Sequence, residues 1–213
     1  MSALSDTAAP PIAVKIVISG GFGVGKTTFV GAISEIEPLV TEAELTERSI
    51  GVDDTSAVSG KTTTTVALDF GRITLDDTLL LYLFGTPGQD RFAFLWDDLV
   101  DGALGAVVLV DTRRVEDSFP AIDYFEENEI PFIVAVNRFD GGQRFGLAEV
   151  RDALGVDATV PIVECDARQR ESVKDVLAAL TEEVLTRRLG ASGPGAVARR
   201  EQGPTSPASR RHP

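Results

Sequence analysis

The chain has 213 residues, of which 43% are hydrophobic and 25% are charged, and its formal net charge is −13 at pH 7. This length suits one well-buried α/β domain with tails, and the acidic balance argues against nucleic acid or an anionic membrane as the main partner. The single Cys165 permits no internal disulfide, which suits a reducing compartment. No apolar run is long enough to span a bilayer, so we expect a cytoplasmic protein unless a partner recruits it to a membrane.

The chain begins with a small, polar, Pro-containing segment, residues 1–11, which we expect to be disordered. An apolar run at Val14–Ser19 predicts the first strand, and the periodic run Lys26–Ile36 predicts the first helix. Residues 38–63 lack a clear period and contain many acidic side chains. A loop of this length inside a compact domain is usually functional or disordered.

Two strands at 64–74 and 79–84, joined at Asp76-Asp77, predict a β-hairpin. Beyond them, helices alternate with strands that are apolar throughout. The expected helices span 91–101, 115–128, 145–154 and 171–189, and the expected strands span 104–110, 131–136 and 160–163.

This order predicts a doubly wound α/β fold: a mostly parallel six-stranded sheet with one antiparallel hairpin strand and helices on both faces. The folded domain would span 12–189. The tail, 190–213, is rich in Arg, Pro, Gly and Ser and cannot bury a core, so we expect it to be disordered.

The stretch Gly20–Thr27 has the spacing G-x-x-x-x-G-K-[ST] between the first strand and the first helix. Its glycines allow successive backbone N–H groups to surround phosphate oxygens, and the helix N-terminus adds positive potential. Lys26 can reach the outer phosphates, and the Thr27 hydroxyl can hold Mg²⁺. The alternative is a glycine-rich turn with a coincidental Gly-Lys-Thr, but the flanking strand and helix favour a nucleoside phosphate site.

A second motif, Asn137-Arg138-Phe139-Asp140, follows a buried strand at the carboxyl edge of the sheet, where the phosphate loop also lies. The Asp140 carboxylate can accept from guanine N1–H and the 2-amino group, whereas adenine would leave its charge unpaired. Asn137 would tie this loop to the phosphate loop, and the stem of Arg138 would cover one face of the base. The alternative is a polar turn that ends the strand. After the last strand, the backbone N–H of Ala167 could meet the guanine carbonyl, although a solvated loop is nearly as good a reading.

Residues 12–189 resemble the Ras-like small GTPases, and among them the bacterial MglA-type group and the conservon-encoded GTPases of actinobacteria. The resemblance is carried by the stretches 20–27, 62–71, 84–92 and 137–140. It implies a P-loop G-domain fold and a GTP-binding switch with Mg²⁺ as cofactor. It also implies effector and regulator partners, among them a roadblock-type protein and a sensor histidine kinase.

One departure from the Ras-like pattern concerns the metal. The pattern has an Asp that positions Mg²⁺ three residues before Gly88-Gln89, and Gly85 stands in its place. A hairpin turn at Asp76-Asp77 would place Asp69 opposite Phe84 and beside Gly85. We therefore expect Asp69 to replace the missing carboxylate. The alternative is that Asp69 is an ordinary surface residue, because strand register is uncertain from sequence.

Hydrolysis of GTP to GDP would depend on Gln89 to orient the attacking water, with Lys26 and Mg²⁺ stabilising charge. Arg48, Lys61 and Arg91 are available cations, but none is an evident arginine finger, so unaided hydrolysis should be slow. The alternatives are a module that binds GTP without hydrolysing it and a P-loop ATPase.

We expect the following residues to form the site. The catalytic residues are Gln89 and Lys26, and the metal-side residues are Thr27, Thr65 and Asp69. The nucleotide-binding residues are Gly21, Gly23, Val24, Gly25, Lys26, Thr27, Thr28, Gly88, Asn137, Arg138, Asp140, Asp166 and Ala167.

Overall fold

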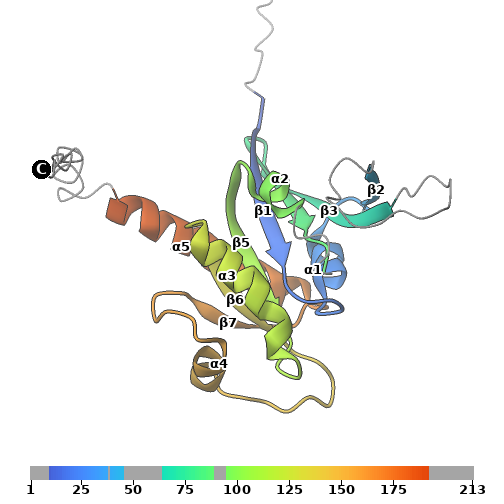
Figure 1. Cartoon of the computed structure of the whole chain (residues 1–213). Coiled ribbons are helices and arrows are strands. Elements are labelled where there is room, and N and C mark those ends of the chain that lie inside the picture. The colour runs from blue at the N-terminus through green and yellow to red at the C-terminus, as the bar shows by residue number, and fades with distance from the viewer. Residues whose placement is uncertain (1–9, 38, 46–63, 89–94, 192–213) are drawn as a thin grey trace, which may run out of the picture.

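The computed structural model describes residues 10–37, 39–45, 64–88 and 95–191. The N-terminal segment 1–9 and the tail beyond residue 191, where we expected disorder, lie outside the described residues. Within the described part, one sheet has the strand order β2-β3-β4-β1-β5-β6-β7 (Figure 1). The strands are β1 (Ile12–Ser19), β2 (Leu39–Leu45), β3 (Thr64–Asp76), β4 (Leu79–Gly85), β5 (Ala103–Val110), β6 (Phe132–Asn137) and β7 (Ile162–Cys165).

The predicted α/β architecture is confirmed. All six predicted strands are present, and β3 is the one antiparallel strand, since it runs against both β2 and β4 while the other neighbours pair in parallel. The seventh strand, β2, lies within the stretch that we expected to be an irregular loop. It pairs with β3 from Leu39 opposite Phe70 to Leu45 opposite Thr64. Pairing with a distant segment produces this strand, which is why the local pattern does not reveal it.

The register of the β3–β4 hairpin differs by one residue from our expectation. Phe84 lies opposite Phe70 rather than opposite Asp69. The turn falls one residue later than expected, which by itself would place Phe84 opposite Gly71, and a β-bulge between Thr74 and Asp76 shifts the pairing back by one residue. In a bulge, two residues of one strand oppose one residue of the other. The turn lies between Asp76 and Leu79, where Asp76 Oδ1 accepts hydrogen bonds from the amide and hydroxyl of Thr78.

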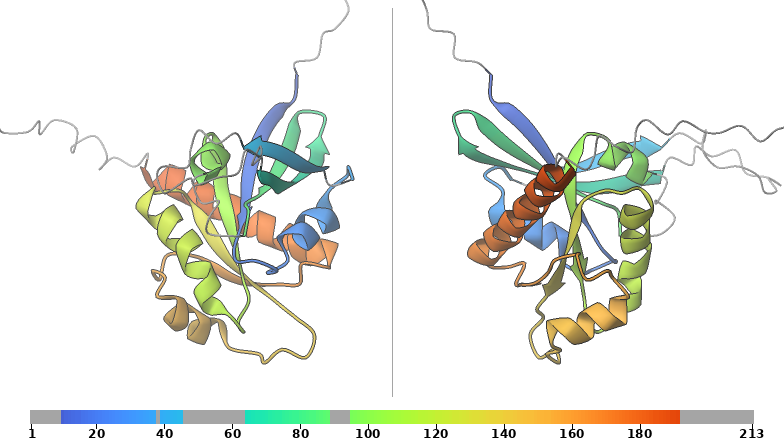
Figure 2. Two further views of the ribbon diagram at one scale, coloured as in Figure 1. Left: turned by 45° about the vertical axis from the view of Figure 1, so that its right-hand side comes forward. Right: turned by 90° about the vertical axis from the view of Figure 1, so that its left-hand side faces the viewer.

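The helices cover both faces of the sheet, as predicted. They are α1 (Lys26–Ile33), α2 (Trp96–Val100), the 3₁₀ helix η3 (Val115–Ser118), α3 (Phe119–Glu127), α4 (Leu147–Leu154) and α5 (Arg170–Ala191). Helices α1 and α5 pack on one face, and α2, α3 and α4 pack on the other (Figure 2). Residues 91–94 of the expected 91–101 helix lie outside the described part.

The core consists of two apolar layers separated by the sheet. One layer joins β1, β5 and β6 to α1 and α5 through residues such as Phe29 and Leu180. The other layer joins β5 and β6 to α2, α3 and α4. It contains an aromatic group in which the ring of Phe125 stacks on Trp96, with 6.3 Å between the ring centroids, and packs on Phe132, with 5.9 Å between the centroids. Strands β5 and β6 are buried on both faces, as their continuous apolar sequences predicted.

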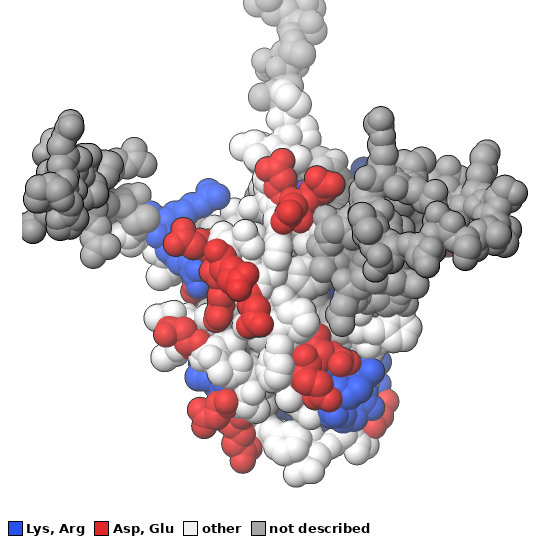
Figure 3. Space-filling model, viewed as in Figure 1, with Lys and Arg blue, Asp and Glu red and all other residues white. Residues whose placement is uncertain are grey.

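Acidic side chains form the larger charged patches on the face shown in Figure 3, including the area around α3. This distribution agrees with the net charge of −13 and gives that face a negative potential. Among the described residues, no helix has the length and apolar character needed to cross a membrane.

We predict that Phe125→Ala lowers the free energy of unfolding by about 3–5 kcal/mol, because the ring is fully buried in the second layer and the substitution leaves a cavity. Urea unfolding followed by the fluorescence of Trp96, the only tryptophan, would measure this loss. Phe119→Ala is the matched control, since that ring at the start of α3 is 38% exposed. Equal losses in the two variants would contradict the assignment of Phe125 to the core.

Candidate nucleotide site

The phosphate loop connects the end of β1 to the first residue of α1, as the sequence predicted. Lys26 is only 8% exposed, and its ammonium donates to the carbonyls of Gly20 at 2.7 Å and Gly21 at 2.8 Å. Burial lowers the pKa of Lys26 to about 8, with the nearby Asp69 carboxylate acting in the opposite direction. The lysine therefore remains largely protonated at pH 7, as a phosphate-binding cation requires.

Gly25 shows why this loop needs glycine. Its φ of +106° lies in a region that residues with a side chain rarely adopt, and a Cβ there would be 2.6 Å from the side-chain nitrogen Nδ2 of Asn137. The close approach lets the loop that follows β6 pack directly against the phosphate loop. A side chain at position 25 would separate the two.

Asn137 joins three loops at the carboxyl edge of the sheet. Its Nδ2 donates to the Val24 carbonyl in the phosphate loop at 2.8 Å, and its Oδ1 accepts from the Ala167 amide at 3.0 Å. The predicted tie between Asn137 and the phosphate loop is therefore confirmed. The Ala167 amide, which we expected to meet the guanine carbonyl, is instead engaged by this asparagine.

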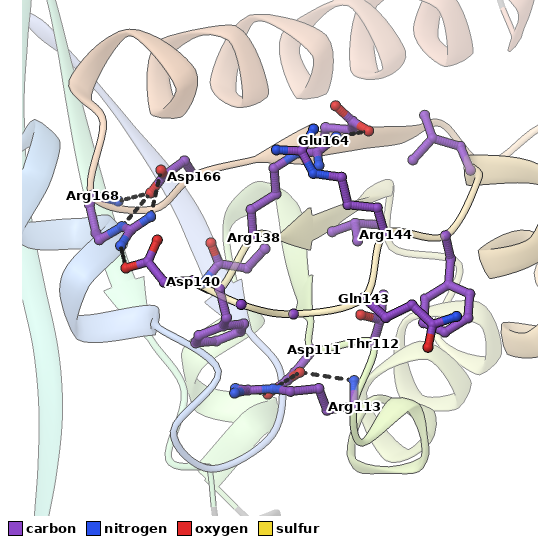
Figure 4. Close-up of a pocket in the computed structure, with 17 residues that line it drawn as sticks. Asp111, Thr112, Arg113, Arg138, Asp140, Gln143, Arg144, Glu164, Asp166 and Arg168 are labelled. Carbon is purple, nitrogen blue, oxygen red and sulfur yellow. Dashed lines mark hydrogen bonds and ion pairs between the residues drawn. The ribbon is translucent and has the colours of Figure 1, made fainter.

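The side chain of Asp140 is 86% exposed and faces Arg168 (Figure 4). Its Oδ2 accepts from Arg168 Nη1 at 2.5 Å, and this hydrogen bond holds the pKa of Asp140 below its usual range. Arg168 also binds Asp166 through two guanidinium nitrogens, each at 2.9 Å. Sequence reasoning assigned no role to Arg168, although its charge beside the Asp166-Ala167 dipeptide was a usable signal.

Arg138 points away from the side of the loop on which Asp140 lies. Its guanidinium forms an ion pair with Glu164 at the end of β7 (Figure 4). The expected place of its stem over a base stays a prediction. Arg138 and Glu164 line a polar cavity of about 350 Å³ that extends to Asp140 and Arg168. Arg144 and Phe145 line the same cavity at its far side.

The metal-side residues lie next to each other. Thr27 Oγ1 donates to Asp69 Oδ2 at 2.8 Å, so two side-chain oxygens from distant segments meet beside the phosphate loop. A Cβ added to Gly85 would be 2.9 Å from Asp69 Cβ and 3.1 Å from its Oδ2. Asp69 therefore occupies the space beside position 85, despite the one-residue difference in register. Thr65 lies on β3, but its side chain is outside the described part of the structure.

Gly88 lies against the phosphate loop: a Cβ there would be 2.7 Å from Lys26 Nζ and 2.9 Å from Phe22 Cα. A side chain at position 88 would therefore displace Lys26. The expected Gln89 and the three candidate cations Arg48, Lys61 and Arg91 lie outside the described residues. Thr28 is exposed on the first turn of α1.

The loop after β5 supplies residues that sequence reasoning missed. Arg114 Nη2 donates to the Phe22 carbonyl at 3.0 Å, which braces the outer side of the phosphate loop. Asp111 is 3% exposed and binds Arg113 through both oxygens, and this pairing lowers the pKa of the Asp111 carboxyl. The guanidinium of Arg113 stacks on the Phe139 ring at 4.0 Å. Charged residues directly after a buried strand were the available signal.

Comparisons with known proteins agree with this geometry. A family described as "conserved hypothetical ATP binding protein" matches residues 18–187. Uncharacterized protein MJ1339 of Methanocaldococcus jannaschii is 30% identical over 131 residues, which are 61% of this chain and 72% of that protein. Ras-related protein Rab-5B of Plasmodium falciparum is 25% identical, covering 82% of this chain and 79% of the relative. Ras-related protein SEC4 of Saccharomyces cerevisiae is 23% identical, covering 56% of this chain and 60% of the relative.

Solved structures show the same fold. The G domain of the T. maritima FeoB iron transporter superposes with a TM-score of 0.56 at 19% identity, over 81% of this chain and 99% of that domain. The cytosolic domain of the same transporter in a GDP form gives 0.58 at 19% identity, over 83% of this chain and 65% of the other.

We predict a pH dependence of stability from Lys26. Its folded pKa of about 8 is below the value for an unfolded lysine, so between pH 8 and 10 the unfolded chain holds a proton that the folded chain has released. The free energy of unfolding should therefore rise with pH in this window, by about 1–2 kcal/mol relative to Lys26→Met. Urea titrations of both proteins at pH 7.5 and 10, without added nucleotide, would measure the difference. Parallel pH profiles would contradict the lowered pKa.

Proposed function

Because the chain belongs to the family described as "conserved hypothetical ATP binding protein" and is similar in sequence to Ras-related proteins, we propose that it is a guanine-nucleotide switch that slowly hydrolyses GTP to GDP. The observation that carries the proposal is the pair of hydrogen bonds made by Asn137. They place the loop with Asp140 and the loop with Asp166 at fixed positions beside the phosphate loop. A ligand that bridges these loops has a phosphate tail at one end and a base at the other.

The phosphate end would be bound mainly by backbone N–H groups. Residues Gly21–Gly25 supply these donors from a loop that glycine allows to turn tightly, and the N-terminus of α1 adds its dipole. Lys26 would supply positive charge to the outer phosphates, since its buried ammonium lies at the centre of the loop. Thr27 and Thr28 follow at the first turn of the helix.

The metal-side residues fit Mg²⁺. This ion prefers oxygen ligands, keeps several waters and is usually bound through one or two carboxylates together with phosphates. Thr27 Oγ1 and Asp69 Oδ2 supply such oxygens 2.8 Å apart beside the phosphate loop. When bound, Mg²⁺ would neutralise charge on the phosphates. Asp69 would act as an outer-shell carboxylate of Mg²⁺ and orient Thr27, and Thr65 would approach the ion from β3 in the GTP form.

The hydrolytic part of the proposal rests on Gln89, which follows Gly88 and would orient the attacking water. The position of Gly88 against Lys26 and Phe22 supports it, because Gly88 directly precedes Gln89 in the sequence. Two alternatives remain: a module that binds GTP without hydrolysing it, and an ATPase, which the family description favours.

The resemblance to the MglA-type and conservon-encoded GTPases supports two further proposals, that a roadblock-type protein and a sensor histidine kinase are partners. A purified roadblock-type protein should then bind the GTP form more tightly than the GDP form. Equal binding to both forms would contradict a switch that is read by this partner.

We predict that Asp69→Gly lowers Mg²⁺-dependent GTP affinity by about 10- to 100-fold, as expected for an outer-shell carboxylate. The double variant Asp69→Gly/Gly85→Asp should recover most of this loss. The exchange fits because the Cβ positions of residues 69 and 85 are 2.9 Å apart, so the carboxylate moves to the neighbouring strand without overcrowding. Titration of GTP at several Mg²⁺ concentrations measures both effects. Normal Mg²⁺ dependence in Asp69→Gly would exclude Asp69 from the metal site.

We also predict slow single-turnover hydrolysis of GTP, on the order of 10⁻⁴ to 10⁻² s⁻¹, that Gln89→Ala abolishes. Rapid-mixing or quench measurements with GTP and, in parallel, ATP would test it, with GDP affinity of the variant as the control for folding. Tight GTP binding without turnover would support the binding module, and turnover of ATP alone would support the ATPase.

A further inference from the structure

Side chains from three segments hold backbone carbonyls of the phosphate loop. The buried Lys26 and Asn137 hold three of them, those of Gly20, Gly21 and Val24. The Phe22 carbonyl accepts from Arg114 Nη2 at 3.0 Å, and Arg114 directly precedes η3 in the loop after β5. Lys26 and Asn137 belong to the predicted site, whereas the sequence assigned no role to Arg114.

The hydrogen bond from Arg114 orients the peptide group between Phe22 and Gly23. A trans peptide is planar, so its C=O and its N–H point in opposite directions. Because Arg114 holds the carbonyl on the outer side of the loop, the Gly23 N–H points to the inner side, where a phosphate would bind. Packing does little to fix this peptide, since the Phe22 ring is 65% exposed and Gly23, with a φ of +71°, has no side chain.

This peptide lies at the end of the phosphate loop that is away from the base loops. At the other end, a Cβ on Gly25 would be 2.6 Å from Asn137 Nδ2. Phe22 lies instead against Gly88, since a Cβ on Gly88 would be 2.9 Å from Phe22 Cα. Gly88 directly precedes the residue that would orient the attacking water. The Gly23 N–H is therefore placed to meet the terminal phosphate rather than the phosphate nearest the base.

Two carboxylates hold Arg114 in this position. Its Nη1 is 3.4 Å from Asp117 Oδ2, and its Nη2 is 3.7 Å from Oδ2 of Asp111, which is buried. Asp117 itself packs on the phosphate loop, because a Cβ on Gly21 would be 2.5 Å from Asp117 Cβ. A group that is held in place before its ligand binds loses less conformational freedom on binding. The guanidinium is therefore in place before a phosphate binds.

We propose that Arg114 is a positioning residue for the terminal phosphate of the nucleotide. It holds the Phe22 carbonyl outward so that the Gly23 N–H faces inward, and it thereby favours a nucleoside triphosphate over a monophosphate. Arg114 acts through the backbone and does not itself contact the nucleotide. The inference rests on the proposed function, because it deepens the account of the same phosphate site.

The test is equilibrium binding of GTPγS, GDP and GMP to the full chain with Mg²⁺, by competition with a fluorescent GDP analogue. Arg114→Ala should weaken GTPγS binding by about 5- to 20-fold, as expected when a charged donor is lost, and should change GMP binding by less than about twofold. Arg114→Lys keeps a donor but cannot reach the Phe22 carbonyl and both carboxylates at once, so it should recover part of the loss. A merely structural role would weaken all three nucleotides equally.

Asp117→Asn separates positioning from simple attraction between Arg114 and the phosphates. Removing a negative charge beside the loop would strengthen GTPγS binding if the electrostatic potential were the main effect. If Arg114 acts by positioning, the same change loosens its guanidinium and should weaken GTPγS binding by about 2- to 5-fold. Tighter GTPγS binding in this variant would overturn the inference.

Arg151→Ala is the matched control. The Arg151 guanidinium also donates to backbone carbonyls, those of Asp157 and Val160, but it lies on α4. This variant should leave the ratio of GTPγS to GMP affinity unchanged, and thermal unfolding of all variants would check their folding.

An unchanged ratio in Arg114→Ala would overturn the inference while leaving the proposed function intact. If the wild type binds only adenine nucleotides, the proposed function fails, and the ratio of ATPγS to AMP affinity tests Arg114 in the same way. If the wild type binds no nucleotide, both the proposed function and the inference fail.

Discussion

One buried amide side chain sets the geometry of the carboxyl edge of the sheet. The parallel pairing of β1, β5, β6 and β7 brings their ends to the same edge, but it does not fix how the loops beyond them are spaced. Asn137 does so, because it is 7% exposed and bonds to the Val24 carbonyl and the Ala167 amide at once. Buried polar groups left without such partners cost about 1–3 kcal/mol each, so the three loops are held together rather than merely adjacent.

The two halves of the candidate site are built from different interactions. The phosphate half consists of backbone groups of the phosphate loop and the buried Lys26. The base half consists of exposed ion pairs, such as Arg168 with Asp140 and Arg138 with Glu164. Such pairs are weak in water and are screened by salt. Base recognition is therefore the part of the site that salt and substitutions of exposed residues readily alter.

Features that depend on neighbouring residues were predictable from the sequence. The phosphate loop and Asn137 were found because their spacing relative to strands is local, and the buried strands β5 and β6 were found because both are apolar throughout. Features that depend on distant pairing were not. The strand β2 exists because β3 pairs with it.

Neither the exact position of the turn nor the bulge before it leaves a clear trace in hydrophobic periodicity, so the register of Asp69 was wrong by one residue even though its proximity to Gly85 was right. The paired hydrogen bonds from the Arg168 guanidinium to the two oxygens of Asp166 depend on side-chain geometry, which the sequence does not show.

Asp69 links the end of the phosphate loop to the edge of the sheet. Asp69 pairs with Val40 of β2, which is the last strand of the described sheet, and it bonds through its side chain to Thr27 at the start of α1. A carboxylate at position 85 would instead belong to β4, one strand further inward than β3. Force applied along β2, for example by a molecule that docks on it, therefore has a mechanical path of a single strand and one hydrogen bond to the first turn of α1.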